Sequence, residues 1–120
     1  MKNPIGIMQG RLLPKYKGRY QAHPVGYWQD EFPKAAELGL DCIEFILDYN
    51  DADQNPLMTQ EGCKEIQAVC ERTGVKVISV CADYFMEAPL HSENNQKAER
   101  SIEVLQQLLK TAAELGVRNI

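Results

Sequence analysis

Several features that mark particular protein classes are missing from this sequence. A formal net charge of −4 at neutral pH leaves no basic surplus to attract a nucleic-acid backbone or an anionic membrane surface. No apolar run approaches the roughly 18 residues that indicate a membrane-spanning helix, and the N-terminus has no secretory-type apolar stretch. We therefore expect neither nucleic acid nor membrane as a partner, and we expect a cytoplasmic location.

Cysteine and histidine are too few and too scattered to predict a metal centre within this chain. The cysteines are Cys42, Cys63, Cys70 and Cys81. They form no C-x-x-C pair, so we interpret them as reduced, mostly buried thiols. His23 and His91 stand alone in predicted loops, where most histidines are neither metal ligands nor acids.

Three short passages repeat the same pattern along the chain. Residues 37–43, 72–78 and 114–120 each run from a helix end through a glycine into the opening of a strand. Glycine suits the position after a helix because the backbone enters the left-handed region there. The glycines are separated by 35 and 42 residues, which is about the length of one strand-helix unit with its loops.

Between these passages the hydrophobic period alternates between that of a strand and that of a helix. Strands are predicted at 5–9, 41–47 and 75–82, and 117–120 would open a fourth. Three helices are expected, capped by Asp30, Thr59 and Ser92 and ending near Leu38, Thr73 and Gly116. In the third helix, steps of four and three predict a buried face made of Ala98, Ile102, Leu105, Leu109 and Ala112.

The order βαβαβα followed by a strand opening predicts an α/β fold with a parallel sheet. We interpret residues 1–120 as one partial domain, the N-terminal half of a (β/α)8 barrel, incomplete without a C-terminal half. A closed barrel takes about 250 residues. An open doubly wound sheet is the competing architecture, and the absence of a G-x-G-x-x-G turn counts against it.

Ligands of such sheets gather where strands end, which here means residues 9–11, 44–48 and 82–91. Within these stretches Gln9, Arg11, Glu44 and Asp83 are the substrate-binding candidates. If Ile43, Phe45 and Leu47 pack on the helices, Glu44 points into the barrel interior. A buried carboxylate there needs a ligand, a metal or an arginine, although a structural salt bridge would also satisfy it.

The third predicted strand carries the second candidate carboxylate at its end. Its alternation places Ser79, Cys81 and Asp83 on one face, with Ile78, Val80 and Ala82 on the other. Asp83 is then expected at the barrel mouth beside Glu44, unless it is only a turn former.

The connection from residue 11 to 29 is unusually long. It mixes Arg11, Lys15, Lys17 and Arg19 with tyrosines and a tryptophan. Loops of this length tend to be lids or binding loops, so its positive charge could receive a sugar phosphate. The alternative is a solvated surface loop whose tyrosines pack on the rim.

Several motifs resemble those of a known family. They are Ile7-Met8-Gln9-Gly10-Arg11-Leu12, Glu31-Phe32, Ile43-Glu44-Phe45-Ile46, Ser79-Val80-Cys81 and Pro89-Leu90-His91-Ser92. The family that they resemble is the xylose isomerase-like TIM barrels of sugar phosphate isomerases and epimerases.

Two positions depart from the family pattern. His23 stands where many relatives have an aromatic residue, and Tyr84-Phe85-Met86 stands where several have a histidine.

The resemblance implies a metal-dependent isomerase or epimerase of carbohydrate metabolism, acting on a ketose or ketose phosphate by proton transfer beside the carbonyl. It also implies a divalent metal (Mn, Co or Mg) in the longer protein, held by two glutamates, an aspartate and a histidine at later strand ends. These positions would fall beyond Ile120, so no catalytic residue is assigned within the chain. What carries over is the substrate rim of Gln9, Arg11, Glu44 and Asp83, and a homo-oligomer is a further expectation.

Two alternatives stay open at this point. An abasic-site endonuclease shares the barrel, but it predicts early histidines and a basic groove that this sequence lacks. A non-catalytic half-barrel module would associate with another half. In either case we expect the isolated 120 residues to show no turnover and no tight metal binding.

Overall fold

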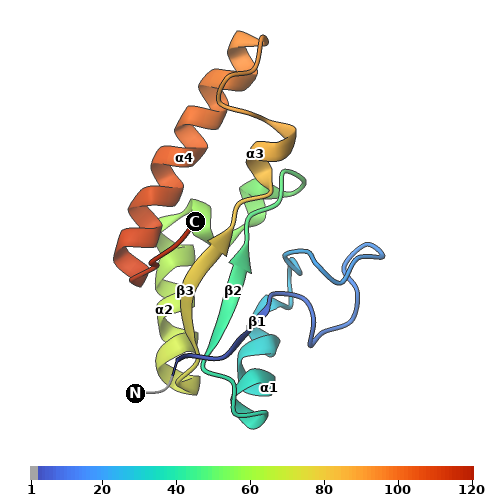
Figure 1. Cartoon of the computed structure of the whole chain (residues 1–120), viewed down its shortest axis with the longest axis vertical. Helices are drawn as coiled ribbons and strands as arrows, with labels where there is room; N and C mark the ends of the chain where they lie inside the picture. The colour runs from blue at the N-terminus through green and yellow to red at the C-terminus, as the bar shows by residue number, and fades with distance from the viewer. Residues whose placement is uncertain (1–2) are drawn as a thin grey trace.

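Three parallel strands form the centre of the computed structural model, which describes residues 3–120. They are β1 (Gly6–Met8), β2 (Cys42–Ile46) and β3 (Lys76–Cys81), in the order β1-β2-β3 (Figure 1). Ile7 pairs with Ile43, and Phe45 pairs with Val80. The three predicted strands therefore lie side by side and point the same way.

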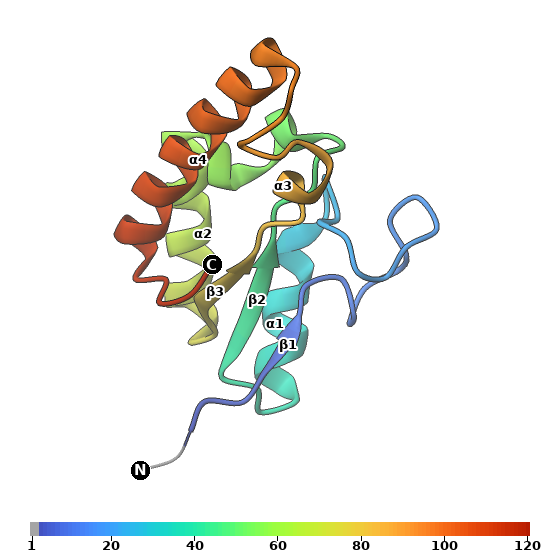
Figure 2. The ribbon, with the colours of Figure 1, turned by 45° about the horizontal axis from the view of Figure 1, so that its top comes forward.

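Four α-helices and three short 3-10 turns connect these strands. The helices are α1 (Glu31–Glu37), α2 (Gln60–Thr73), α3 (Tyr84–Glu87) and α4 (Asn95–Leu115). The 3-10 turns are η1 (Trp28–Asp30), η2 (Ala52–Gln54) and η3 (Pro56–Met58). Helices α1 and α2 lie behind the sheet, with α4 beside α2 (Figures 1 and 2). Among residues 3–120, no helix combines the length and apolarity needed to span a bilayer.

The hydrophobic core lies between the sheet and these helices. Ile43, Phe45 and Leu47 of the second strand region are fully buried there, as the predicted alternation requires. They pack with residues of α2 and α4 such as Ile66 and Leu108. Each such side chain stabilises the fold by about 1.5–3 kcal/mol relative to an exposed one. The opposite sheet face, which carries Glu44, is not covered by a helix in the part of the chain described (Figure 1).

The last residues return to the sheet beside β3. The Arg118 N–H donates to the Ile78 carbonyl at 2.8 Å, and the Val80 N–H donates to the Asn119 carbonyl at 3.0 Å. Asn119 forms a parallel bridge with Ser79. The predicted opening of a fourth strand is thus confirmed, and the three glycine-punctuated passages are successive returns into one parallel sheet.

The helix ends agree with the sequence in part. Thr59 caps α2 by accepting the Gly62 N–H at 2.9 Å, as expected. Asp30 precedes α1 but makes no side-chain cap bond. The prediction of Ser92 as the cap of the long helix is wrong. Asn94 takes that position and accepts the Lys97 N–H at 3.1 Å, while Ser92 instead accepts the Asn94 N–H.

The predicted buried face of α4 is also wrong in large part. Ile102 is 46% exposed and Leu109 is 52% exposed, and the buried residues are Ser101, Val104, Leu108, Thr111 and Ala112. Two hydroxyls explain the rotation, because Ser101 donates to the Ala88 carbonyl at 2.7 Å and Thr111 to the Leu57 carbonyl at 2.8 Å. Hydrogen bonding allows these polar side chains to face inward.

Strand β3 departs from strict alternation. Cys42 pairs with Lys76, but Glu44 pairs with Ser79, so β3 contains one extra residue opposite Ile43. Such a bulge reverses the faces of the residues on one side of it. Val80 joins the core, whereas Ile78 lies with Glu44 on the uncovered face. This is contrary to the predicted alternation, which placed Ile78 and Val80 on the same face.

Candidate functional site

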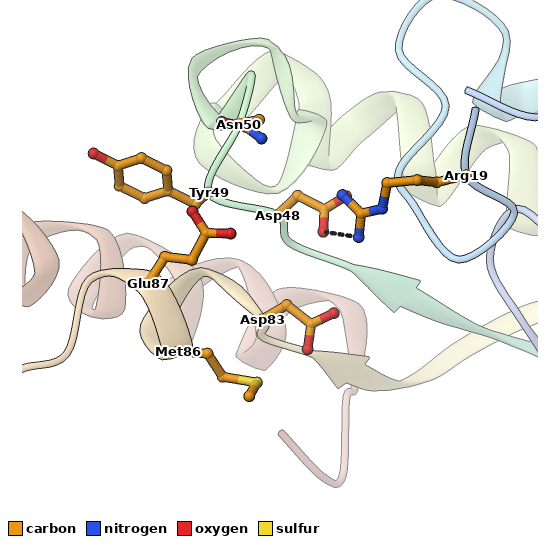
Figure 3. A pocket seen from close by; sticks show the side chains of 7 residues that line it. All are labelled: Arg19, Asp48, Tyr49, Asn50, Asp83, Met86 and Glu87. Carbon is orange, nitrogen blue, oxygen red and sulfur yellow. Dashed lines mark ion pairs between the residues drawn. The ribbon is translucent and has the colours of Figure 1, made fainter. Parts of the chain in front are cut away.

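A polar pocket lies at the carboxyl ends of β2 and β3, where the architecture places ligands. Its volume is about 390 Å³, and it is lined by Arg19, Asp48, Tyr49, Asn50, Asp83, Met86 and Glu87 (Figure 3). Arg19 comes from the long connection after β1, and the other six follow β2 or β3. The lining combines three carboxyl groups with a single guanidinium, a set suited to hydrogen bonding with a polar ligand.

Asp48 is the most buried acid of the pocket, at 8% exposure. Its Oδ2 accepts the His23 N–H at 3.0 Å, and its Oδ1 lies 3.7 Å from the Arg19 Nη2 (Figure 3). Burial raises the pKa of Asp48, and the negative charges of Asp83 and Glu87 act in the same direction. The His23 N–H and the Arg19 charge oppose this rise. One oxygen is therefore fixed by the backbone, and the other faces the only cation of the lining.

Asp83, one of the predicted substrate residues, does line this pocket. It follows β3 directly, and its Oδ1 accepts a hydrogen bond from the Cys81 Sγ at 3.3 Å. Burial, and after it this bond to Asp83, raises the pKa of Cys81 to about 11, so the thiol stays protonated near neutral pH. The assignment of Asp83 to substrate binding stays a prediction that this position favours.

Glu44 occupies a different hollow, so the structure does not join it with Asp83 in one pocket as expected. It accepts the Ser79 hydroxyl at 2.8 Å on the uncovered sheet face, in a hollow that Met8 and Cys42 also line. The proposed salt bridge of Glu44 is not seen among residues 3–120. Its role in substrate binding stays a prediction.

Gln9 is fully buried directly after β1. Its Oε1 accepts the Ile46 N–H at 2.9 Å, so the side chain extends the ladder between β1 and β2 beyond Met8. The same oxygen lies 3.2 Å from the His23 Nδ1. Because the Ile46 N–H fixes this oxygen as the acceptor, His23 carries its proton on Nδ1. Substrate contact by Gln9 stays a prediction, and its position identifies it first as an anchor of the rim.

His23 is only 3% exposed, and its ring lies 5.3 Å from that of Phe45. Burial lowers the pKa of His23 to about 4, so the imidazole is neutral at physiological pH. Within the described part of the chain, the Nε2 atoms of His23 and Gln9 have no hydrogen-bond partner.

Arg11, the remaining predicted substrate residue, is exposed on the long connection. Its Nη2 donates to the Gln21 Oε1 at 3.3 Å. It does not line the pocket at the ends of β2 and β3. Its role also stays a prediction.

Glu31 anchors the start of this connection, and the sequence analysis did not assign it a role. Its fully buried carboxylate accepts the Gly10 N–H at 2.8 and 2.9 Å and the Leu12 N–H at 3.0 Å. Burial raises the pKa of Glu31, and these bonds oppose the rise. Gly10 has a φ of 93°, and a Cβ there would lie 2.0 Å from the Tyr20 carbonyl oxygen, so the turn requires glycine.

The tip of the connection is a small hairpin in which Tyr16 and Arg19 exchange two backbone hydrogen bonds. Lys17 and Gly18 have φ values of 48° and 80°, the positive values that a type I′ turn requires. The Lys17 Nζ lies 2.9 Å from Asp51, which also accepts the Tyr16 hydroxyl at 2.8 Å. The loop after β2 thus neutralises two of the positive charges, Lys17 through Asp51 and Arg19 through Asp48.

A metal site is not formed by the residues described. Among residues 3–120, no group of three or more histidine, cysteine, aspartate or glutamate side chains is arranged to hold a metal ion. The resemblance assigns the metal ligands to positions beyond Ile120, so the divalent metal stays a prediction.

The sequence reasoning missed Asp48, Arg19 and Glu87 as a group. Asp48 directly follows the core residue Leu47, at the edge of the region where ligands were expected, so its position carried a signal. Glu87 also lies in a stretch where ligands were expected, residues 82–91, but the short helix α3 that presents it was not predicted.

Comparison with known proteins agrees with the parallel α/β fold. Residues 32–120 match the family described as xylose isomerase-like TIM barrel. The whole chain is similar to proteins named L-ribulose-5-phosphate 3-epimerase UlaE from Salmonella heidelberg (strain SL476) and Salmonella paratyphi B (strain ATCC BAA-1250 / SPB7). The identity is 30% over 120 residues in both cases, covering 98% of this chain and 38% of each relative. The chain thus spans about two fifths of the length of these relatives.

Proposed function

Because the chain belongs to the xylose isomerase-like TIM barrel family, we propose that it is part of a metal-dependent sugar phosphate epimerase or isomerase. In this proposal it supplies the first strands of the barrel and part of the substrate rim. The observation that carries the proposal is the polar pocket at the carboxyl ends of two adjacent parallel strands. The name of the relatives supports a ketopentose phosphate as substrate.

The proposed reaction moves a proton on the carbon beside the ketose carbonyl. The residues of this chain bind and orient the substrate, with Asp48 and Asp83 accepting hydrogen bonds from hydroxyls and Arg19 donating one. A divalent metal (Mn, Co or Mg) would polarise the substrate oxygens. Since residues 3–120 form no metal site, the proposal assigns the metal and the acid-base pair to other residues of a longer protein. Homo-oligomer formation and a cytoplasmic location stay predictions.

Hydrogen exchange at carbon tests this function directly. The protein encoded by the complete reading frame is incubated with L-ribulose 5-phosphate and Mn²⁺ in deuterated water, and NMR follows deuterium entering beside the carbonyl. We expect incorporation that stops when the metal is chelated. Asp48→Asn should slow it, whereas Asp51→Asn, which changes an acid outside the pocket, should not. Absence of exchange with a panel of ketoses and ketose phosphates would contradict the proposal.

A non-catalytic half-barrel module is the second candidate, because α4 exposes Ile102 and Leu109 and one sheet face has no helix over it. Both surfaces would suit a complementary half. Size-exclusion and hydrogen-exchange measurements on the 120-residue chain test it, and a stable, well-protected monomer would contradict it. The abasic-site endonuclease gains no support, since the pocket carries three acids and one arginine.

A further inference from the structure

Building on the proposed function, we infer that Arg19 and Asp48 receive an uncharged vicinal diol of the ketose. The phosphorylated end of the substrate, where there is one, then points away from the ends of β2 and β3. This assigns one part of the substrate to this part of the rim.

The geometry of the pair suits a diol. The Asp48 Oδ2 is occupied by the His23 N–H, which leaves Oδ1, the oxygen nearer Arg19, free to accept from a ligand (Figure 3). The Arg19 Nη2 donates to the Gln21 carbonyl at 3.1 Å and lies 3.7 Å from the Asp48 Oδ1, beyond ordinary hydrogen-bond length. Asp48 Oδ1 and the remaining N–H groups of the Arg19 guanidinium therefore keep hydrogen-bonding capacity. Two neighbouring hydroxyls complement this arrangement, because one donates to Asp48 while the other accepts from Arg19.

Asp48 differs from a surface acid in how firmly it is held. It is 8% exposed and fixed by a backbone N–H, so its free oxygen has a defined direction before a ligand arrives. Such preorganisation lowers the entropic cost of binding. The Arg19 side chain, at 53% exposure, can adjust to the second hydroxyl.

The charge of the pocket excludes a phosphate at the same place. Asp48, Asp83 and Glu87 oppose the single cation Arg19, so a dianion would meet net repulsion. Lys17 is paired with Asp51, and Arg19 lies near Asp48. Two of the four positive charges that the sequence offered as a phosphate receptor are therefore engaged by acids of the protein itself, and the other two, Arg11 and Lys15, do not line this pocket.

Two probes test the inference on the protein encoded by the complete reading frame. L-ribulose and inorganic phosphate are titrated separately at millimolar concentrations, and NMR follows the His23 backbone amide and the Arg19 Nε. We expect L-ribulose to shift both signals and inorganic phosphate to shift neither. The inference is overturned if inorganic phosphate shifts the Arg19 Nε signal, or if L-ribulose shifts neither the His23 amide signal nor the Arg19 Nε signal.

Variants then locate the binding. Asp48→Asn should weaken L-ribulose binding about tenfold, because a hydrogen bond to a charged group is replaced by one to a neutral amide. Asp51→Asn is the matched control and should leave the affinity within twofold. Combining Asp48→Asn with Asp83→Asn and Glu87→Gln should allow inorganic phosphate to shift the Arg19 Nε. If Asp48→Asn binds L-ribulose as tightly as the unaltered chain does, the assignment to Asp48 is wrong.

These outcomes separate the inference from the proposed function. Deuterium exchange reports turnover by the complete protein, whereas the titrations report where each chemical group binds. Turnover together with phosphate binding at Arg19 would overturn only the inference. L-ribulose binding at Asp48 without any turnover would overturn only the proposed function.

Discussion

Two regions of the molecule are stabilised by different interactions. One is the layer, the apolar core between the sheet and the helices, and the other is the rim, which here means residues 9–31 after β1. In the layer, apolar side chains such as Phe45, Ile66 and Leu108 are fully buried. In the rim, the buried groups are polar, and Gln9 and Glu31 are held by hydrogen bonds to backbone N–H groups. The hydrophobic effect has no directional requirement, so the burial of apolar side chains is enough to stabilise the layer. Hydrogen bonds depend on geometry, so the rim needs acceptor atoms at defined positions.

The largest effect is expected in the layer. Phe45→Ala removes a ring that lies 5.6 Å from Trp28 and 5.3 Å from His23, and it should lower the free energy of unfolding by about 3–5 kcal/mol. Urea unfolding measures this. Ile102→Ala, at a position 46% exposed on α4, is the control and should cost less than about 0.5 kcal/mol. Equal losses in the two variants would mean that the layer is not the main source of stability.

The next largest effect is the pH dependence of the unfolding free energy, which arises from His23, a buried residue between the rim and the layer. Burial lowers the pKa of His23 from 6.5 to about 4. As the pH falls, the imidazole is therefore protonated in the unfolded chain before it is protonated in the folded protein. Stability from His23 is thus complete above about pH 6.5 and is lost as the pH falls to about 4, by roughly 3 kcal/mol.

His23→Phe isolates this contribution. The raised pKa values of Glu31 and Asp48 change stability in the opposite direction, but they act in both proteins and largely cancel in the comparison. We expect the unfolding free energy of the variant, relative to the unaltered chain, to rise as the pH falls from 6.5 to 4. Parallel pH profiles would show that the pKa of His23 is the same in the folded and unfolded protein, which would contradict the lowered value.

Within the rim, Glu31→Gln should cost about 2 kcal/mol, because an amide cannot accept as many N–H bonds as the carboxylate does. Glu37→Gln, at an exposed position of the same helix, should change stability by less than about 0.5 kcal/mol. Hydrogen exchange provides a second measurement, since the amides of Gly10 and Leu12 should exchange faster in the Glu31 variant only. Unchanged exchange there would contradict the anchoring role.

The smallest effect is expected at the hairpin tip. Lys17 has a φ of 48°, so Lys17→Gly relieves backbone strain that Lys17→Ala retains. Both lose the exposed pair with Asp51, which contributes little. The glycine variant should therefore be the more stable of the two by about 1 kcal/mol in thermal or urea unfolding. The reverse order would mean that the tip does not hold this backbone conformation in solution.

The sequence predicted the layer better than the rim. Glycine spacing and strand periodicity placed β1, β2 and β3, and they placed Phe45 in the core. The buried face of α4 was wrong because the hydroxyls of Ser101 and Thr111 are satisfied by carbonyls distant in the sequence. The hydrophobic pattern along the sequence does not show which carbonyl groups accept these hydrogen bonds.

The same limit applies to the site. Asp83 was identified because it follows a strand, and it lines the pocket. The pairing of Arg19 with Asp48 joins residues 29 positions apart, and Glu31 bonds to Gly10 across 21 positions. Acidic residues are common, so their types and spacing alone do not show which of them face each other.

The closed hairpin at Tyr16 and Arg19 also makes a practical attachment point. Tyr16 and Arg19 already satisfy each other's backbone N–H and carbonyl groups, and nothing lies within 4 Å of the position that a Cβ on Gly18 would occupy. A short epitope or a fluorescent label grafted at this tip would project outward from the protein. The rim could then be monitored by spectroscopy without changing its anchors.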